Sequence, residues 1–224
     1  MKDAPSRLLA EFTGVFFLCL FGIGAITNTA KLENGGGLVA VALAHGLAIF
    51  VSVCAFAHIS GAHFNPAVTV AMAATKRISL VDGLGYIGAQ LVGGLAAAFV
   101  ANYAFGSDWS GVPAMAPGFS PTHGIAVEAI ATFALLMVIM GVAVDSRGTF
   151  GAVAGLPIGL VITADILWSG PITGAAMNPA RWFGPALVKG DLGNAAVWIV
   201  GPIVGALIAV YLYDLIVKPA KAAA

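Results

Sequence analysis

The chain has 224 residues, of which 60% are hydrophobic and 9% are charged, and its formal net charge is +0. Soluble domains are about half apolar and about a quarter charged, so this composition excludes a soluble globular protein and predicts an integral protein of the lipid bilayer. The neutral net charge favours no nucleic-acid partner, and Cys19 and Cys54 lack the C-x-x-C spacing of a redox or metal site.

Six apolar segments are long enough to cross a membrane, which takes about 20 mainly apolar residues. In chain order they cover residues 8–27, 38–58, 81–105, 124–144, 150–168 and 195–217. The first contains Glu11 and lacks a small-x-small cleavage site, so we expect a retained membrane helix rather than a signal peptide.

Two shorter apolar segments, 65–75 and 178–188, each begin with Asn-Pro-Ala and would cross only about half of a membrane. Asn is a favoured helix N-cap, and Pro suits the first helical position, so both boxes predict a helix start. Because the cap uses the side-chain oxygen of Asn, its NH2 group stays available as a donor. Two such starts in mid-membrane would point their positive dipole ends at one place, which suits a neutral polar guest and repels cations. The residues of this predicted midplane are Asn65, Pro66, Ala67, Asn178, Pro179 and Ala180.

The two halves of the chain share the order span, span, short segment, span. Gly46-Leu47 is repeated as Gly159-Leu160, at the same offset as the two Asn-Pro-Ala boxes. An odd number of spans per half turns the second half upside down relative to the first. We therefore expect a single membrane domain over residues 1–224, built from inverted repeats at approximately 8–105 and 124–217.

The basic residues predict that both termini are cytoplasmic, because cytoplasmic loops carry an excess of Lys and Arg. In this orientation only Lys31 and Lys189 lie outside. The cytoplasmic basic residues are then Lys2, Arg7, Lys76, Arg77, Arg147, Lys218 and Lys221.

Ionisable residues within predicted spans are costly and are candidates for function. Arg181 directly follows the second Asn-Pro-Ala, where a cation opposes the helix dipole, so we expect it to repel cations and donate hydrogen bonds to a passing molecule. Glu11 and Glu128 occupy matching places in the two halves. They are expected to brace the loops that lead into the short helices, whose backbone groups lipid cannot satisfy, with a proton relay or ion-coupling site as the alternative. Asp165 has no counterpart and no assigned role.

The four histidines have different expected places. His63 precedes the first Asn-Pro-Ala and is expected to line or brace the inner vestibule. His58 is expected at a solvated helix end, and His123 has no assigned role. His45 lies in mid-span, where a neutral ring with a free donor or acceptor suits a pore wall.

The sequence contains no G-x-S-x-G, P-loop or H-E-x-x-H motif in a usable context. We therefore expect no enzymatic activity, no cofactor and no metal ion.

The motifs S-G-A-H-x-N-P-A-V-T and N-P-A-R-x-F-G-P-A, the paired glutamates and the inverted halves together resemble the aquaporin, or major intrinsic protein, family over essentially the whole chain. The resemblance implies an all-α membrane fold of six transmembrane helices plus two re-entrant half-helices, with one pore per subunit and assembly as a homotetramer. Asn65 and Asn178 would donate to a single-file molecule. Exclusion of ions by an arginine and by half-helix dipoles is already described for aquaporin-type pores.

The resemblance also places an outer selectivity filter at His45, Ile166, Ala175 and Arg181. Water-selective members usually have Phe at the first position and His at the second, so this ring should be wider and differently polar. It is similar to that of some plant vacuolar-membrane members, which are associated with ammonia and other small neutral solutes. Glycerol channels carry Asp directly after the second-box arginine, where this chain has Trp182, so the water branch is favoured.

The sequence thus predicts a passive channel that conducts water and excludes protons and ions. The alternatives are a channel with broader selectivity for ammonia, urea or glycerol, an ion-coupled secondary transporter, and a structural membrane protein that has lost transport. The short tails suit a prokaryotic cell (inner) membrane.

Overall fold

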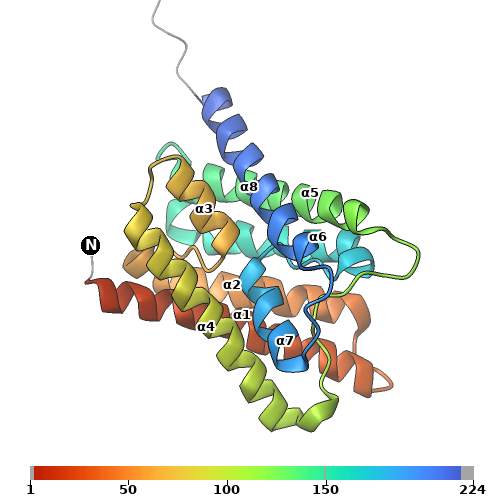
Figure 1. Ribbon diagram of the computed structural model, residues 1–224. Helices are drawn as coiled ribbons and strands as arrows, with labels where there is room; N and C mark the ends of the chain where they lie inside the picture. Colours follow the sequence, from red (N-terminus) through yellow and green to blue (C-terminus); the bar gives the residue numbers. More distant parts are fainter. Residues whose placement is uncertain (1–2, 149, 218–224) are drawn as a thin grey trace, which may run out of the picture.

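The computed structural model describes residues 3–148 and 150–217. Lys2, Lys218 and Lys221, which entered the prediction of orientation, lie outside the described residues. Six long helices dominate the fold, and two short helices interrupt their sequence (Figure 1). The long helices are α1 (Ala4–Lys31), α2 (Gly37–Ser60), α4 (Leu80–Phe105), α5 (Pro121–Ile139), α6 (Gly155–Thr173) and α8 (Ala195–Val217). The short helices are α3 (Pro66–Ala74) and α7 (Pro179–Lys189).

Within the described residues, six helical segments are long and apolar enough to cross a membrane. Short turns complete two of the connections: 3-10 turns at Gly106–Asp108 and Gly151–Val153, and a π-helical turn at Met140–Val144 that extends α5. The predicted fold class, an all-α membrane protein with six spans and two shorter helices, is confirmed. The division into inverted repeats at 8–105 and 124–217 stays a prediction.

The fifth span was predicted at 150–168, and this placement is wrong, because α6 covers Gly155–Thr173. The Gly170-Pro171 pair resembles a helix stop, but Pro171 lies in the last turn and the helix continues to Thr173. Gly174 has a φ of 78°, and its N–H donates to the carbonyl of Gly170 at 2.9 Å, which closes the helix with a left-handed glycine. At the N-terminal end of α6, the 3-10 turn Gly151–Val153 occupies residues that were predicted to begin the fifth span.

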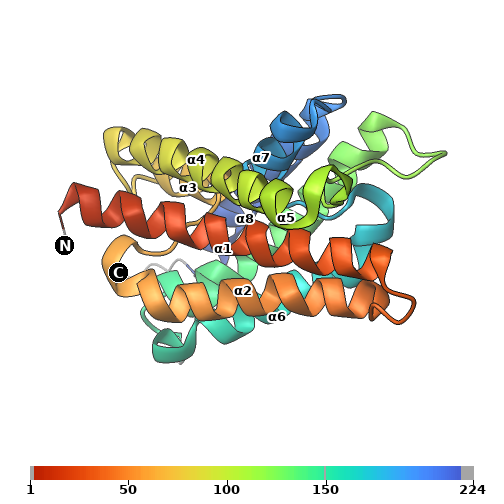
Figure 2. The same cartoon turned by 90° about the horizontal axis from the view of Figure 1, so that it is seen from below.

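The packing of the helices ties the two halves of the chain together. Helix α1 packs against α2 and α4, α5 packs against α6 and α8, and α2 packs against α6. Figure 2 shows α1 and α2 side by side, joined at one end by the turn after Lys31. The short helix α3 packs against α8, and α7 packs against α4. Each short helix therefore contacts a long helix that is distant in sequence.

Small residues allow these helices to approach closely, as expected in lipid. A Cβ atom on Gly205 would lie 2.8 Å from the backbone carbon of Ala129, and one on Gly93 would lie 3.2 Å from that of Phe12. Gly93 of α4 and Gly205 of α8 therefore lie at contacts between backbones.

Candidate functional site

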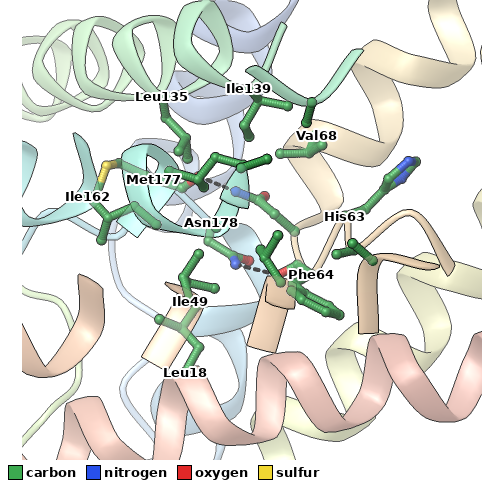
Figure 3. Close-up of a pocket in the computed structure, with 18 of the residues that line it drawn as sticks. Leu18, Ile49, His63, Phe64, Val68, Leu135, Ile139, Ile162, Met177 and Asn178 are labelled. Carbon is green, nitrogen blue, oxygen red and sulfur yellow. Dashed lines mark hydrogen bonds between the residues drawn. The ribbon is translucent and has the colours of Figure 1, made fainter. Parts of the chain in front are cut away.

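The two Asn-Pro-Ala boxes meet through a reciprocal pair of hydrogen bonds between their loops. Asn65 donates from Nδ2 to the carbonyl of Met177 at 2.7 Å, and Asn178 donates from Nδ2 to the carbonyl of Phe64 at 2.8 Å (Figure 3). Each asparagine thus binds the residue that directly precedes the other asparagine. One hydrogen of each NH2 group is used within the protein, and the second remains available.

The same asparagines cap the short helices with their oxygens. Asn65 Oδ1 accepts from the N–H of Ala67 at 2.8 Å. Asn178 Oδ1 accepts from the N–H groups of Ala180 and Arg181 at 3.0 and 3.3 Å. The N-terminal ends of α3 and α7, and with them the positive ends of the helix dipoles, are therefore fastened together.

The loops that lead into the short helices contain left-handed backbone at non-glycine residues. Ala62 and Phe64 have φ values of 53° and 48°, and Ala175 and Met177 have φ values of 44° and 51°. Left-handed backbone costs about 1–2 kcal/mol for each such residue. A strained loop of this kind persists only where its surroundings hold it.

Glu11 of α1 holds the first loop. Its side chain is 0% exposed, Oε1 accepts from Ser60 Oγ at 2.7 Å and the N–H of His63 at 3.0 Å, and Oε2 accepts from the N–H of Phe64 at 2.7 Å. Gln90 of α4 adds a fourth donor, Nε2, at 2.7 Å. Both oxygens of this carboxylate are therefore engaged by protein donors.

Glu128 of α5 holds the second loop in the same way. It is 0% exposed, Oε1 accepts from Thr173 Oγ1 at 2.6 Å and the N–H of Ala176 at 2.9 Å, and Oε2 accepts from the N–H of Met177 at 2.7 Å. Trp198 Nε1 donates to the carbonyl of Thr173 at 3.0 Å, at the start of the same loop.

Gln90, Tyr86 and Trp198 were not singled out from the sequence, although each contacts one of these loops. Besides binding Glu11, Gln90 donates to Thr69 Oγ1 at 3.0 Å, and Tyr86 donates from its hydroxyl to the carbonyl of Ser60 at 2.7 Å. For Gln90 the available signal was an amide side chain in the middle of an apolar span, where a polar group without a hydrogen-bond partner is costly.

A cavity of about 460 Å³ extends past Asn65 and Asn178, which both line it. Its wall along α2 extends from His45 to His58, about 20 Å of helix at 1.5 Å per residue. Figure 3 shows apolar side chains around the two dashed hydrogen bonds. These side chains are Leu18, Ile49, Val68, Leu135, Ile139 and Ile162. The cavity therefore combines a few polar groups with a largely apolar wall.

All four predicted filter residues and His63 line this cavity, as do Asn65 and Asn178. The other midplane residues, Pro66, Ala67, Pro179 and Ala180, are buried in the first turns of α3 and α7 and are not part of the lining. Their place is behind the asparagines, where they form the helix starts.

His45 and Arg181 contact each other in the cavity wall. Arg181 donates from Nε and Nη2 to His45 Nε2 at 3.2 and 3.1 Å. Both residues are buried, since Arg181 is 4% exposed and His45 is 2% exposed. A guanidinium only donates, so Nε2 is the unprotonated ring nitrogen. Nδ1 then carries the hydrogen and donates to the carbonyl of Val41 at 2.8 Å. The expectation of a free donor or acceptor on His45 is wrong, because both ring nitrogens have protein partners.

Arg181 itself keeps one free group. Its Nη1 is buried and has no hydrogen-bond partner among the described residues. The guanidinium therefore carries one unpaired buried donor on a residue of the cavity wall.

The remaining singled-out residues have other surroundings. The ring of His63 bonds Thr69 Oγ1 through Nδ1 at 3.1 Å, and His58 is an exposed residue of the lining. His123 is exposed and contacts Phe119 edge to face. Asp165 is buried, and its Oδ1 accepts from Trp168 Nε1 at 3.2 Å. In residues 3–148 and 150–217, no group of three or more His, Cys, Asp or Glu side chains is placed to hold a metal ion.

The sequence profile of the family described as "Major intrinsic protein" matches residues 2–213. The chain belongs to the major intrinsic protein family. The family consists of channels rather than enzymes, so the chain is a multi-pass membrane channel protein.

Known relatives and a solved structure cover nearly the whole chain. Aquaporin TIP4-4 from Zea mays is 43% identical and the alignment covers 92% of this chain and 84% of the relative. Aquaporin NIP1-1 from Zea mays is 41% identical, with coverage of 94% and 74%. The X-ray structure of the aquaglyceroporin from Plasmodium falciparum superposes with a TM-score of 0.88 at 26% identity, covering 97% of this chain and 98% of that one.

Proposed function

We propose that this major intrinsic protein is a passive channel that conducts water down its osmotic gradient and excludes protons and ions. The observation that carries the proposal is the reciprocal bonding of Asn65 and Asn178 in the wall of the cavity. It fixes two amide donors side by side, next to the positive ends of two helices.

Water passes because the donors replace part of its hydration without holding it. Each asparagine offers its second Nδ2 hydrogen to the oxygen of a water molecule, while the apolar wall across the cavity offers no competing partner. Binding of this kind is favourable enough for entry and weak enough for release.

Cations and protons are excluded by fixed positive charge. The dipole ends of α3 and α7 converge at the asparagines, and the guanidinium of Arg181 lies in the first turn of α7. A cation in the cavity would meet these charges in a medium of low dielectric constant, where repulsion is stronger than in water.

The selectivity filter consists, on this proposal, of His45, Ile166, Ala175 and Arg181. A broader selectivity for ammonia, urea or glycerol is the second candidate. The small Ala175 and the aliphatic Ile166 in the wall favour this broader selectivity, since neither narrows the cavity as an aromatic side chain would. The similarity to an aquaglyceroporin points the same way.

On this proposal, Glu11 and Glu128 hold the strained loops in place. Seven hydrogen bonds from neighbouring donors reach their four oxygens. A proton relay would require these carboxylates to release their partners in each cycle, so the bracing role is the simpler one.

Assembly and orientation complete the proposal. Four copies are expected to form a homotetramer in which each copy carries its own pore, with both termini in the cytoplasm of a prokaryotic cell. Exposed apolar side chains on α2 and α6, such as Leu43, Leu47 and Leu160, suit contact with lipid or with a neighbouring copy. Native mass measurement in mild detergent tests the number of copies.

Stopped-flow light scattering on reconstituted vesicles tests the function. Water, glycerol, urea and ammonia are compared, each with and without an imposed proton or sodium gradient. We expect water flux well above that of bare lipid and independent of both gradients. Flux that follows an ion gradient would identify a coupled transporter, and flux equal to that of bare lipid would identify a protein without transport.

A further inference from the structure

Gly22 of α1 lies against the imidazole ring of His45. A Cβ atom built on Gly22 would lie 2.7 Å from Cε1 and 2.8 Å from Cδ2 of that ring, and closer still to Nε2. These three ring atoms are its nearest neighbours. At Gly93 and Gly205, in contrast, the nearest atoms belong to the backbone of a packed helix. The missing side chain at Gly22 therefore makes room for a side chain of the cavity wall.

The position of the His45 ring is fixed from three sides. Its Nδ1 donates to the carbonyl of Val41, one turn earlier on α2. Its Nε2 accepts from Arg181, and the same end of the ring lies against Gly22. A side chain at position 22 would have to push the ring away from α1, at the cost of the bond to Arg181 or of space in the cavity.

We propose that Gly22 is a positioning residue that determines solute specificity, because it seats the His45 ring against α1 where the ring holds Arg181 in the wall. The effect on flux rests on the proposed channel function. Gly22 touches no solute and acts only through His45 and Arg181.

The substitution Gly22→Ala tests this directly. A displaced ring intrudes into the cavity, and a released guanidinium follows it, so larger solutes should be hindered more than water. We expect the ratio of urea to water permeability to fall roughly tenfold, the factor that corresponds to about 1.4 kcal/mol of barrier. Gly24→Ala is the matched control, because a Cβ atom on Gly24 of the same helix meets nothing within 4 Å.

A double-mutant cycle separates this mechanism from a general disturbance of α1. If Gly22 acts through His45, then Gly22→Ala should change the permeability ratio in the wild-type background and leave it unchanged in a His45→Ala background. An equal fold-change in both backgrounds, or no change in either, would overturn the proposal.

Two further measurements keep the test decisive. If Gly22→Ala alone fails to insert or fold, adding His45→Ala should restore expression, and failure of the double variant as well would count against the proposal. Solid-state NMR of ¹⁵N-histidine protein, assigned by comparison with His45→Ala, reports the ring without any flux. We expect the Nε2 signal of His45 to shift in Gly22→Ala and to stay in place in Gly24→Ala. Wild-type vesicles without flux would refute the proposed function, and an unshifted Nε2 signal would refute the positioning role.

Discussion

The backbone of Gly46 in α2 lies directly against that of Gly159 in α6. A Cβ atom on Gly46 would lie 2.5 Å from the carbonyl oxygen of Gly159, and one on Gly159 would meet the carbonyl of Gly46. Thr163 bridges the same crossing, since its hydroxyl is 3.0 Å from the carbonyl of Gly159 and 3.3 Å from that of Ala42. The two glycines thus set how closely α2 and α6 approach, and both helices supply residues of the cavity wall.

Gly46→Ala should therefore destabilise the protein. Extra atoms in a packed interface typically cost about 1–3 kcal/mol, because backbones have to shift. Thermal unfolding in detergent measures the change, with Gly88→Ala as the control, since a Cβ atom on Gly88 of α4 meets nothing within 4 Å. Equal melting temperatures for both variants would contradict the tight crossing.

Glu128→Gln should lower both the melting temperature and the water flux. A Gln side chain accepts through one oxygen only, so at least one buried donor among Thr173, Ala176 and Met177 loses its partner. An unsatisfied buried donor costs about 1–3 kcal/mol. Glu33→Gln is the control, because Glu33 is exposed. A variant with full stability but altered response to a proton gradient would favour the relay instead.

Arg181→Val should admit larger solutes and loosen the exclusion of protons. It removes the fixed charge and the free Nη1 donor from the wall, and it empties the space that the guanidinium fills. We expect glycerol permeability to rise by roughly tenfold, or about 1.4 kcal/mol of barrier. Vesicles loaded with a pH-sensitive dye measure the proton leak, with Arg77→Val at the exposed ion pair to Asp214 as control. Leakage unchanged from wild type would remove Arg181 from the proposed filter.

The double variant His45→Phe/Ile166→His restores the pair of residues usual in water-selective members. It should slow urea and ammonia relative to water, because the side chain of Phe at position 45 is larger than that of His and narrows the filter formed by the four residues. Wild type and variant are compared side by side in vesicles of equal protein content. Equal solute-to-water ratios would refute the argument that the present ring is wider.

The contacts of Asp145, at the end of α5, should survive mild acid. Hydrogen bonds from the side chain and backbone N–H of Arg147 hold the pKa of Asp145 well below its usual range, and Tyr213 donates to Oδ2 at 3.1 Å. A lowered pKa means that the stabilisation is present above the unfolded value of about 3.9 and is lost only as the pH falls through the folded value.

Hydrogen exchange of the amides at 145–148, corrected for the intrinsic rate, should therefore show equal protection at neutral pH and near pH 5. Asp145→Asn should lower this protection at neutral pH and near pH 5, and the protection that remains should not fall further in stronger acid. Protection that already fades well above pH 4 in the wild type would contradict the lowered pKa.

The sequence by itself determined the membrane spans and the two helix starts, because both are local properties. The length of an apolar run decides whether a segment spans, and Asn followed by Pro caps a helix whatever surrounds it. The family was equally readable, since its motifs are contiguous. The exception was α6, whose bounds depend on where it packs against α2 and on a glycine that closes it after a proline.

Only the tertiary structure decided the partners of the polar residues. Asn65 and Met177 are far apart in the chain, and no local pattern specifies that an amide of one loop binds a carbonyl of the other. The protonated nitrogen of His45 follows from a contact with Arg181 across the fold, and the room for its ring follows from Gly22 on a third helix. A sequence shows which side chains lie in a membrane, but their chemistry depends on neighbours that folding alone brings together.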